Sequence, residues 1–190
     1  MSLTKNNRPA LLLVDIQKGF DDIAYWGGQR NNLLAEQNAA ALLQIWRTLE
    51  LPVFHIQHCS TNPASPLHPT HTGNALKEIV KPLNTEVVIK KNVNSAFIGT
   101  PLEKLLKNDN ITTLVIAGLT TDHCVSTTVR MAGNLGFSNF VVEDATATFN
   151  KKGWDGKNYS AEWIHETALA SLHNEFATII TTEFVIKSIR

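Results

Sequence analysis

The stretch "TTLVIAGLTTDHCVSTT", residues 112–128, joins an almost continuously apolar run to a polar turn that contains Cys124. A short apolar run that ends at a turn is typical of a strand covered on both faces in a parallel sheet. Helical spacing follows, because one face of the next segment carries Val125, Val129, Ala132 and Leu135. The stretch therefore predicts a buried strand, a tight turn and a helix, with Cys124 in or beside the first helical turn.

Further runs of the same apolar character occur along the chain. They are "ALLLVDI" (10–16), "PVFHIQH" (52–58), "TEVVIKK" (85–91), "NFVVEDA" (139–145) and "ATIITT" (177–182). Segments with helical spacing separate them, the last one marked by Ile164, Ala168, Leu172 and Phe176. This alternation predicts an α/β fold, a three-layer αβα sandwich around a mostly parallel, roughly six-stranded, Rossmann-like sheet. At 190 residues the chain suffices for one domain, residues 1–190.

The charges of the chain are balanced. Lysine and arginine together number 17, as do aspartate and glutamate, so the formal net charge is zero. This composition offers no broad basic surface for nucleic acid or anionic lipid, and we expect a small-molecule substrate instead. The polar N-terminal segment, and Asp15 within the first apolar run, fit neither a signal peptide nor a membrane span. We therefore expect a cytoplasmic protein.

Polar side chains follow the ends of the predicted strands. Asp15, His58 and Lys91 end the first three strands, and Cys124 follows the fourth. Ligands of such sheets bind outside the carboxyl ends of the strands, near the point where strand order reverses. A charge directly after five apolar residues costs free energy unless it is paired, so Asp15 requires a partner. Lys91 is the expected partner, because its neighbour Lys90 points to the opposite face.

A cysteine, a lysine and an aspartate at one edge suit attack on a carbonyl group. The thiol must lose a proton to attack and the leaving amine must gain one, so a carboxylate can act first as base and then as acid. A helix N-terminus favours the thiolate form of Cys124, Asp15 and Asp122 would oppose it if close, and Lys91 is the best-placed compensating cation. Backbone amides in the turn before the helix can stabilise the oxyanion.

Other functions of Cys124 stay open at this point. Free cysteine is often a core residue, and Cys59 could form a disulfide with Cys124 in a redox sensor. A non-catalytic binding module is a third alternative. Zinc is a fourth, because several possible ligands lie close together in the sequence, namely His55, His58, Cys59, His68 and His71. No CxxC pair is present, however, and His55 and His58 face opposite ways on one strand.

Four segments of this chain resemble the isochorismatase-like cysteine hydrolases, a family that includes nicotinamidases, N-carbamoylsarcosine amidohydrolases and ureidoacrylate hydrolases. The segments are "LLLVDIQKGF" (11–20), "KNVNSAFIGTPLE" (91–103), "GLTTDHCVSTTVRMAGNLGF" (118–137) and "VVEDATATF" (141–149). They occur in the family's order, and the resemblance covers nearly the whole chain. It implies the isochorismatase-like hydrolase fold.

The resemblance also implies roles for individual residues. Asp15, Lys91 and Cys124 take the positions of the family's catalytic triad. A cis peptide bond would join Leu119 to Thr120, and the amides of Thr120 and Cys124 would form the oxyanion hole. The resemblance further implies a homo-oligomer, either a dimer or a tetramer.

Two departures from the family's patterns narrow the expected reaction. The segment "HIQHCSTN" (55–62) lacks the aspartate and paired histidines of metal-dependent nicotinamidases, so we expect no metal and no cofactor. Isochorismatases proper lack the cysteine, so Cys124 favours cleavage of a C–N bond in a small amide, carbamoyl or ureido compound. Hydrolysis of another small metabolite by an isochorismatase-type route is the alternative.

Specificity is expected in the proline-rich loop from Cys59 to Gly73 and in side chains near the triad. The candidates for substrate contact are Gln17, Phe20, Trp26, His58, Asn94, Phe97, Asp122, His123 and Trp154.

Overall fold

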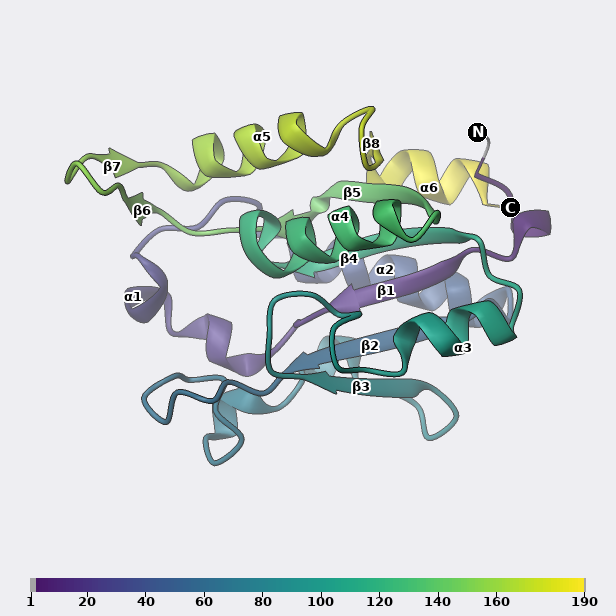
Figure 1. Cartoon of the computed structure of the whole chain (residues 1–190), viewed down its shortest axis with the longest axis horizontal. Coiled ribbons are helices and arrows are strands. Elements are labelled where there is room, and N and C mark those ends of the chain that lie inside the picture. The colour runs from purple at the N-terminus through teal and green to yellow at the C-terminus, as the bar shows by residue number, and fades with distance from the viewer. Residues whose placement is uncertain (1–2, 190) are drawn as a thin grey trace.

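A computed structural model describes residues 3–189 of the chain (Figure 1). Its main sheet has six parallel strands in the order β3-β2-β1-β4-β5-β8. The strands are β1 (Ala10–Val14), β2 (Val53–His58), β3 (Val87–Lys91), β4 (Thr113–Leu119), β5 (Ser138–Ala147) and β8 (Thr178–Ile180). A short antiparallel hairpin pairs β6 (Lys151–Lys152) with β7 (Asn158–Tyr159). The predicted parallel α/β sheet is confirmed.

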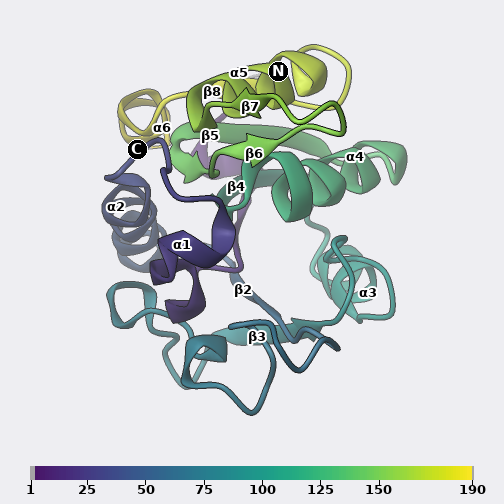
Figure 2. The same ribbon diagram turned by 90° about the vertical axis from the view of Figure 1, so that its left-hand side faces the viewer.

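Helices cover both faces of the sheet (Figure 2). On one face lie α2 (Ala35–Thr48) and α6 (Thr182–Ser188), and on the other lie α3 (Leu102–Asn108), α4 (Ser126–Asn134) and α5 (Ala161–Leu172). The short helix α1 (Ile23–Trp26) follows β1. No helix within residues 3–189 is both long and apolar enough to cross a membrane.

The alternation of side chains along β1 divides the core into two parts. Leu11 and Leu13 pack with α2 on one face, whereas Leu12 and Val14 pack with α3 and α4 on the other. Successive strand residues point to opposite faces, so a strand buried on both sides is apolar throughout. This is why the first apolar run lacks the polar alternation of a half-exposed strand.

The sheet reverses its strand order at β1, with β2 on one side of it and β4 on the other. At the carboxyl end of this pair the two backbones approach closely at Gly118, where φ is +127° and an added Cβ would lie 2.0 Å from the carbonyl oxygen of Val14. Glycine is therefore required at this position. The close approach brings the residue after β1 next to the turn that follows β4.

The buried face of α5 differs by one position from the sequence prediction. The spacing suggested Ile164 and Ala168, but these side chains are half-buried, and His165 and Leu169 are buried instead. The helix ends at Leu172, so Phe176 lies beyond it. The buried His165 has a hydrogen-bond partner, the Oγ1 of Thr121, in the turn after β4.

Candidate active site

Asp15 directly follows β1 and is fully buried. Its φ angle is +52°, a left-handed conformation that aspartate tolerates better than most residues. Its Oδ2 accepts a hydrogen bond of 2.6 Å from the Nζ of Lys91, whereas its Oδ1 is buried and has no hydrogen-bond partner among the described residues. One carboxylate oxygen is therefore anchored, and the other is available to accept a proton.

Lys91 is the last residue of β3, and its side chain is fully buried while that of Lys90 is exposed, as the strand alternation predicts. Its ammonium donates to the Oδ2 of Asp15 at 2.6 Å, to the Nδ1 of His58 at 3.0 Å and to the Sγ of Cys124 at 3.3 Å. A lysine ammonium has three N–H donors, so this set of acceptors uses all of them. The sequence prediction that these ionisable side chains meet at one edge agrees with this geometry.

Cys124 lies in a π-helical turn, Thr121–Val125, that leads into α4. Burial, together with the negative charge of Asp15, raises the pKa of the Cys124 thiol, and the ammonium of Lys91 offsets only part of this effect. The helix start and Lys91 were expected to favour the thiolate and Asp15 to oppose it, and in this geometry burial and Asp15 have the larger effects on the pKa. The sulfur of Cys124 lies beside the buried ion pair of Asp15 and Lys91.

Backbone hydrogen bonds fix the turn before Cys124. The peptide bond from Leu119 to Thr120 is cis. The carbonyl oxygen of Thr120 accepts hydrogen bonds from the amides of His123 and Val125, at 3.2 and 3.1 Å. These bonds hold the sulfur-bearing segment against the end of β4.

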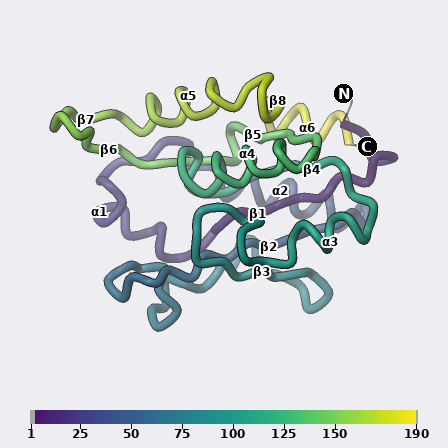
Figure 3. The backbone as a smooth tube through the Cα atoms, viewed as in Figure 1, coloured from purple at the N-terminus to yellow at the C-terminus, as the bar shows by residue number. Residues whose placement is uncertain are grey.

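A cavity of about 450 Å³ adjoins this turn. Helix α1 and the β6–β7 hairpin lie at the same end of the molecule (Figure 3), and both contribute to its wall. Its residues are Tyr25, Trp26, Gly27, Thr120, His123, Thr148, Phe149, Asn150, Lys151 and Lys152. Thr120 and His123 belong to both the cavity wall and the turn that carries Cys124, whereas the side chains of Asp15, Lys91 and Cys124 do not line the cavity.

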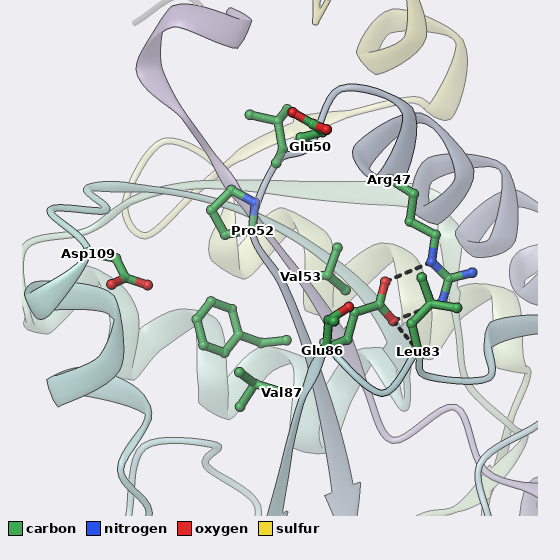
Figure 4. Close-up of a pocket in the computed structure, with 11 residues that line it drawn as sticks. Arg47, Glu50, Pro52, Val53, Leu83, Glu86, Val87 and Asp109 are labelled. Atoms are coloured by element: carbon green, nitrogen blue, oxygen red, sulfur yellow. Dashed lines mark hydrogen bonds and ion pairs between the residues drawn. The ribbon is translucent and has the colours of Figure 1, made fainter.

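Figure 4 shows the lining of a second cavity, of about 350 Å³, at the amino ends of two strands. It adjoins the start of β2 at Val53 and the start of β3 at Val87. Two of its charged groups pair with each other, because the Nε of Arg47 donates to Glu86 at 2.7 Å and the Nη2 donates to the same carboxylate at 2.8 Å. This cavity is distant from the triad along the strands and does not belong to the site.

Comparisons with known proteins agree with this arrangement. A family model for the isochorismatase domain matches residues 9–184. The isochorismatase family protein YrdC of Bacillus subtilis (strain 168) is 52% identical over 179 residues, which cover 94% of this chain and 95% of YrdC. The chain belongs to the isochorismatase family.

Other members extend the comparison. A crystal structure from Chromobacterium violaceum ATCC 12472, described as a hydrolase of the isochorismatase family, has a TM-score of 0.93 and 43% identity, and the match covers 99% of this chain and 97% of that one. Nicotinamidase 3 of Arabidopsis thaliana is 28% identical over 193 residues, 95% of this chain and 88% of its own. Maleamate amidohydrolase of Pseudomonas putida is 26% identical over 197 residues, 96% of this chain and 87% of its own.

Some of the side chains that we expected to contact substrate do lie near the triad of this isochorismatase family member. The Oδ1 of Asn94 is 3.9 Å from the Sγ of Cys124, and Trp26 and His123 line the cavity beside Thr120. Phe20 lies behind Trp26, with ring centroids 4.7 Å apart, so it supports that wall.

Other expected contacts have structural roles instead. The side-chain amide of Gln17 is fully buried and bonded to the backbone of His58 and Asn74. Phe97 is buried and stacks on Phe137 in the core. Burial alone would raise the pKa of Asp122, but hydrogen bonds from Lys151 and Thr148 lower it.

Trp154 differs from both groups, because it lies in the β6–β7 hairpin and is 100% exposed. These expected contacts differ in their surroundings because sequence position near a motif does not specify the direction of a side chain.

A buried pair behind the catalytic turn was missed by the sequence analysis. The Oγ1 of Thr121 lies 2.9 Å from the Nδ1 of His165, and the Nε2 of His165 lies 3.4 Å from the side-chain nitrogen of Asn32. Asn32 in turn donates to the carbonyl oxygens of Glu143 and Thr146, both at 2.8 Å. The signal was a histidine among apolar residues of α5, which indicates a buried polar partner.

The proposed zinc cluster does not assemble. The Nε2 of His55 contacts Glu86 at 2.9 Å, and His68 and His71 contact Thr70 and the carbonyl oxygen of Pro63. Within residues 3–189, side chains of metal-binding type come together only at Asp15, His58 and Cys124. There the ammonium of Lys91 already bonds to all three, so the chain supplies its own positive charge.

The two cysteines have separate partners. The Sγ of Cys59 accepts a hydrogen bond of 3.9 Å from Asn74, and the Sγ of Cys124 contacts Lys91, so both are free thiols. The redox-sensor alternative stays a prediction that oxidation experiments can test.

Proposed function

We propose that this isochorismatase family member is a cysteine hydrolase that cleaves a C–N bond of a small amide, carbamoyl or ureido compound. The observation that carries the proposal is the ammonium of Lys91, which contacts the Oδ2 of Asp15 at 2.6 Å and the Sγ of Cys124 at 3.3 Å. A nucleophile, a proton carrier and a fixed positive charge therefore meet in one buried site.

In the first step, the Sγ of Cys124 attacks the substrate carbonyl carbon. Because burial keeps the thiol protonated, its proton must leave as the S–C bond forms. The free carboxylate oxygen of Asp15 is the proposed acceptor, since the ligand atoms of these two residues lie within 4.8 Å of each other. The carbonyl π electrons move to oxygen, and the amides of Thr120 and Cys124 are the proposed donors to this oxyanion.

In the second step, the tetrahedral intermediate collapses and the C–N bond breaks. Asp15 returns its proton to the leaving nitrogen, which departs as an amine or ammonia, and a thioester to Cys124 remains. A water molecule then attacks the thioester carbon while Asp15 takes one of its protons. The C–S bond breaks, the acid product leaves, and the proton returns to sulfur, so no cofactor is needed.

The proposed substrate-binding site is the 450 Å³ cavity beside Thr120. Trp26 and Phe149 give it an aromatic wall, 6.2 Å apart between ring centroids, which suits a small planar compound. The names of two relatives, a nicotinamidase and a maleamate amidohydrolase, support amide hydrolysis as the reaction class. The expected homo-oligomer and cytoplasmic location stay predictions.

The test is hydrolysis of a panel of small amides, carbamoyl compounds and ureido acids by the wild-type protein and two cysteine variants. Cys124→Ala should lose all turnover of a substrate found in this way while its thermal melt stays close to wild type. The matched control Cys59→Ala should keep wild-type turnover. Hydrolysis at an unchanged rate by Cys124→Ala would contradict the proposed mechanism.

A further inference from the structure

His58 makes a contact that the proposed reaction does not require. Its Nδ1 lies 3.0 Å from the Nζ of Lys91 and is the third acceptor of that ammonium, beside the carboxylate of Asp15 and the sulfur of Cys124. Sequence analysis placed His58 among the substrate contacts. Instead, its ring is directed to the lysine that joins the other two catalytic side chains.

The contact with Lys91 determines the protonation state and tautomer of the His58 imidazole. Lysine can only donate, so Nδ1 must carry a lone pair and the ring must be neutral with its proton on Nε2. The charge of Asp15 and a backbone hydrogen bond with Val93 favour the protonated ring, but their effects are the smaller ones. Burial and the charge of Lys91 lower the pKa of His58, which keeps the ring neutral at pH 7. A second cation beside Lys91 is thereby avoided.

Two buried amide side chains fix the backbone that carries this ring. Gln17 accepts from the amide of His58 at 2.8 Å, and its Nε2 donates to the carbonyl oxygens of His58 at 3.0 Å and of Asn74 at 2.7 Å. The Nδ2 of Asn74 also donates to the carbonyl oxygen of His58, at 2.8 Å. Gln17 is fully buried, so a core side chain holds the backbone of His58, a residue outside the triad.

We propose that His58 is a positioning residue for the hydrolysis, whose neutral imidazole holds the Lys91 ammonium between Asp15 and Cys124. The inference rests on the proposed function for its consequence in catalysis. Coulomb attraction alone would draw the ammonium toward the carboxylate, because the neutral thiol attracts it weakly. The Nδ1 acceptor, rigidly placed by Gln17 and Asn74, opposes this displacement and keeps one N–H on the sulfur.

The first test measures the thiol without any substrate. In a Cys59→Ser background, the rate of Cys124 alkylation by iodoacetamide is followed against pH in His58→Ala, His58→Asn and the control His68→Ala. The charged and titratable groups that face the sulfur are Asp15 at the end of β1, His58 at the end of β2 and Lys91 at the end of β3. Asparagine is included because its Oδ1 can replace the Nδ1 acceptor.

In His58→Ala the ammonium leaves the sulfur, so the thiolate fraction decreases and the rate of alkylation at each pH from 7 to 9 should fall about tenfold. His58→Asn should restore the rate to within about threefold of the parent, and His68→Ala should leave it unchanged. An unchanged alkylation rate in His58→Ala across this pH range would overturn the proposal. If that variant does not fold, His58→Leu, which fills the space without an acceptor, takes its place.

The second test uses a substrate identified by the panel. A positioning role predicts that His58→Ala lowers kcat and leaves KM nearly constant, with rescue by His58→Asn. A raised KM with unchanged kcat would show that His58 binds substrate and would refute the proposed role. Failure of the whole panel would count against the proposed function alone, because the alkylation measurement does not depend on it.

Discussion

Lys91→Met removes the ammonium at the centre of the site and keeps a side chain of similar length. The side chains of Lys91 and Asp15 are both fully buried, with 2.6 Å between Nζ and Oδ2. Loss of one partner of such a pair leaves an uncompensated charge in a dry environment, which typically costs about 3–5 kcal/mol of unfolding free energy. Because the ammonium also contacts the Sγ of Cys124 at 3.3 Å, the same variant should lose turnover.

The matched control is Lys18→Met. Lys18 pairs with Glu78 at 3.2 Å, but the two side chains are 44% and 69% exposed. Solvent screens such a pair, so its loss should cost less than about 1 kcal/mol. The same substitution at two lysines therefore separates the burial of the ion pair from the general effect of replacing lysine by methionine.

The assay is urea unfolding followed by tryptophan fluorescence, with a double-mutant cycle that adds Asp15→Asn. Since the double variant has no unpaired buried charge, it should be at least about 2 kcal/mol more stable than the sum of the single effects predicts. A cost of Lys91→Met within about 1 kcal/mol of the Lys18→Met control would refute the buried ion pair that the site depends on.

Three further predictions concern other parts of the molecule. Burial alone would raise the pKa of Glu36, but hydrogen bonds from Arg30 and Lys77 lower it to about 2, so this carboxylate stabilises the fold above its ordinary pKa of 4.5. That stabilisation is lost as the pH falls from about 5 to 2. Urea titrations should therefore show that the unfolding free energy of Glu36→Gln decreases less over this pH range than that of the wild type, by up to about 3 kcal/mol. Gly118→Ala should cost more than about 4 kcal/mol or prevent folding, because its Cβ would collide with Val14, whereas Gly99→Ala, with open space around it, should cost about 1 kcal/mol in the same titration. Trp26→Ala should raise KM about tenfold by removing a cavity wall, and Trp154→Ala should leave KM unchanged because that ring is fully exposed, so equal effects would contradict the placement of the cavity.

The fold could be predicted from the sequence because each central strand is buried on both faces. The run from residue 112 to 119 corresponds to β4, which begins at Thr113 and ends at Leu119. Alternation within "TEVVIKK" also separated the buried Lys91 from the exposed Lys90. These features are local, since strand period and apolar content alone determine them.

The contacts of each candidate residue could not be predicted from the sequence in the same way. Gln17 follows Asp15 by two residues, yet its amide bonds to His58, 41 residues away. Likewise, the pKa of Cys124 depends on burial and on the charge of Asp15, whose combined effect exceeds that of Lys91. Both facts arise from long-range packing, and a single sequence gives no measure of it.

The most direct test of the central claim is mass spectrometry of the protein quenched in acid during turnover of an amide substrate. The account predicts a mass increase on the peptide that contains Cys124, equal to the substrate minus its departing amine or ammonia, and no such increase in Cys124→Ala. Turnover without this adduct, together with activity retained in Cys124→Ala, would contradict the account.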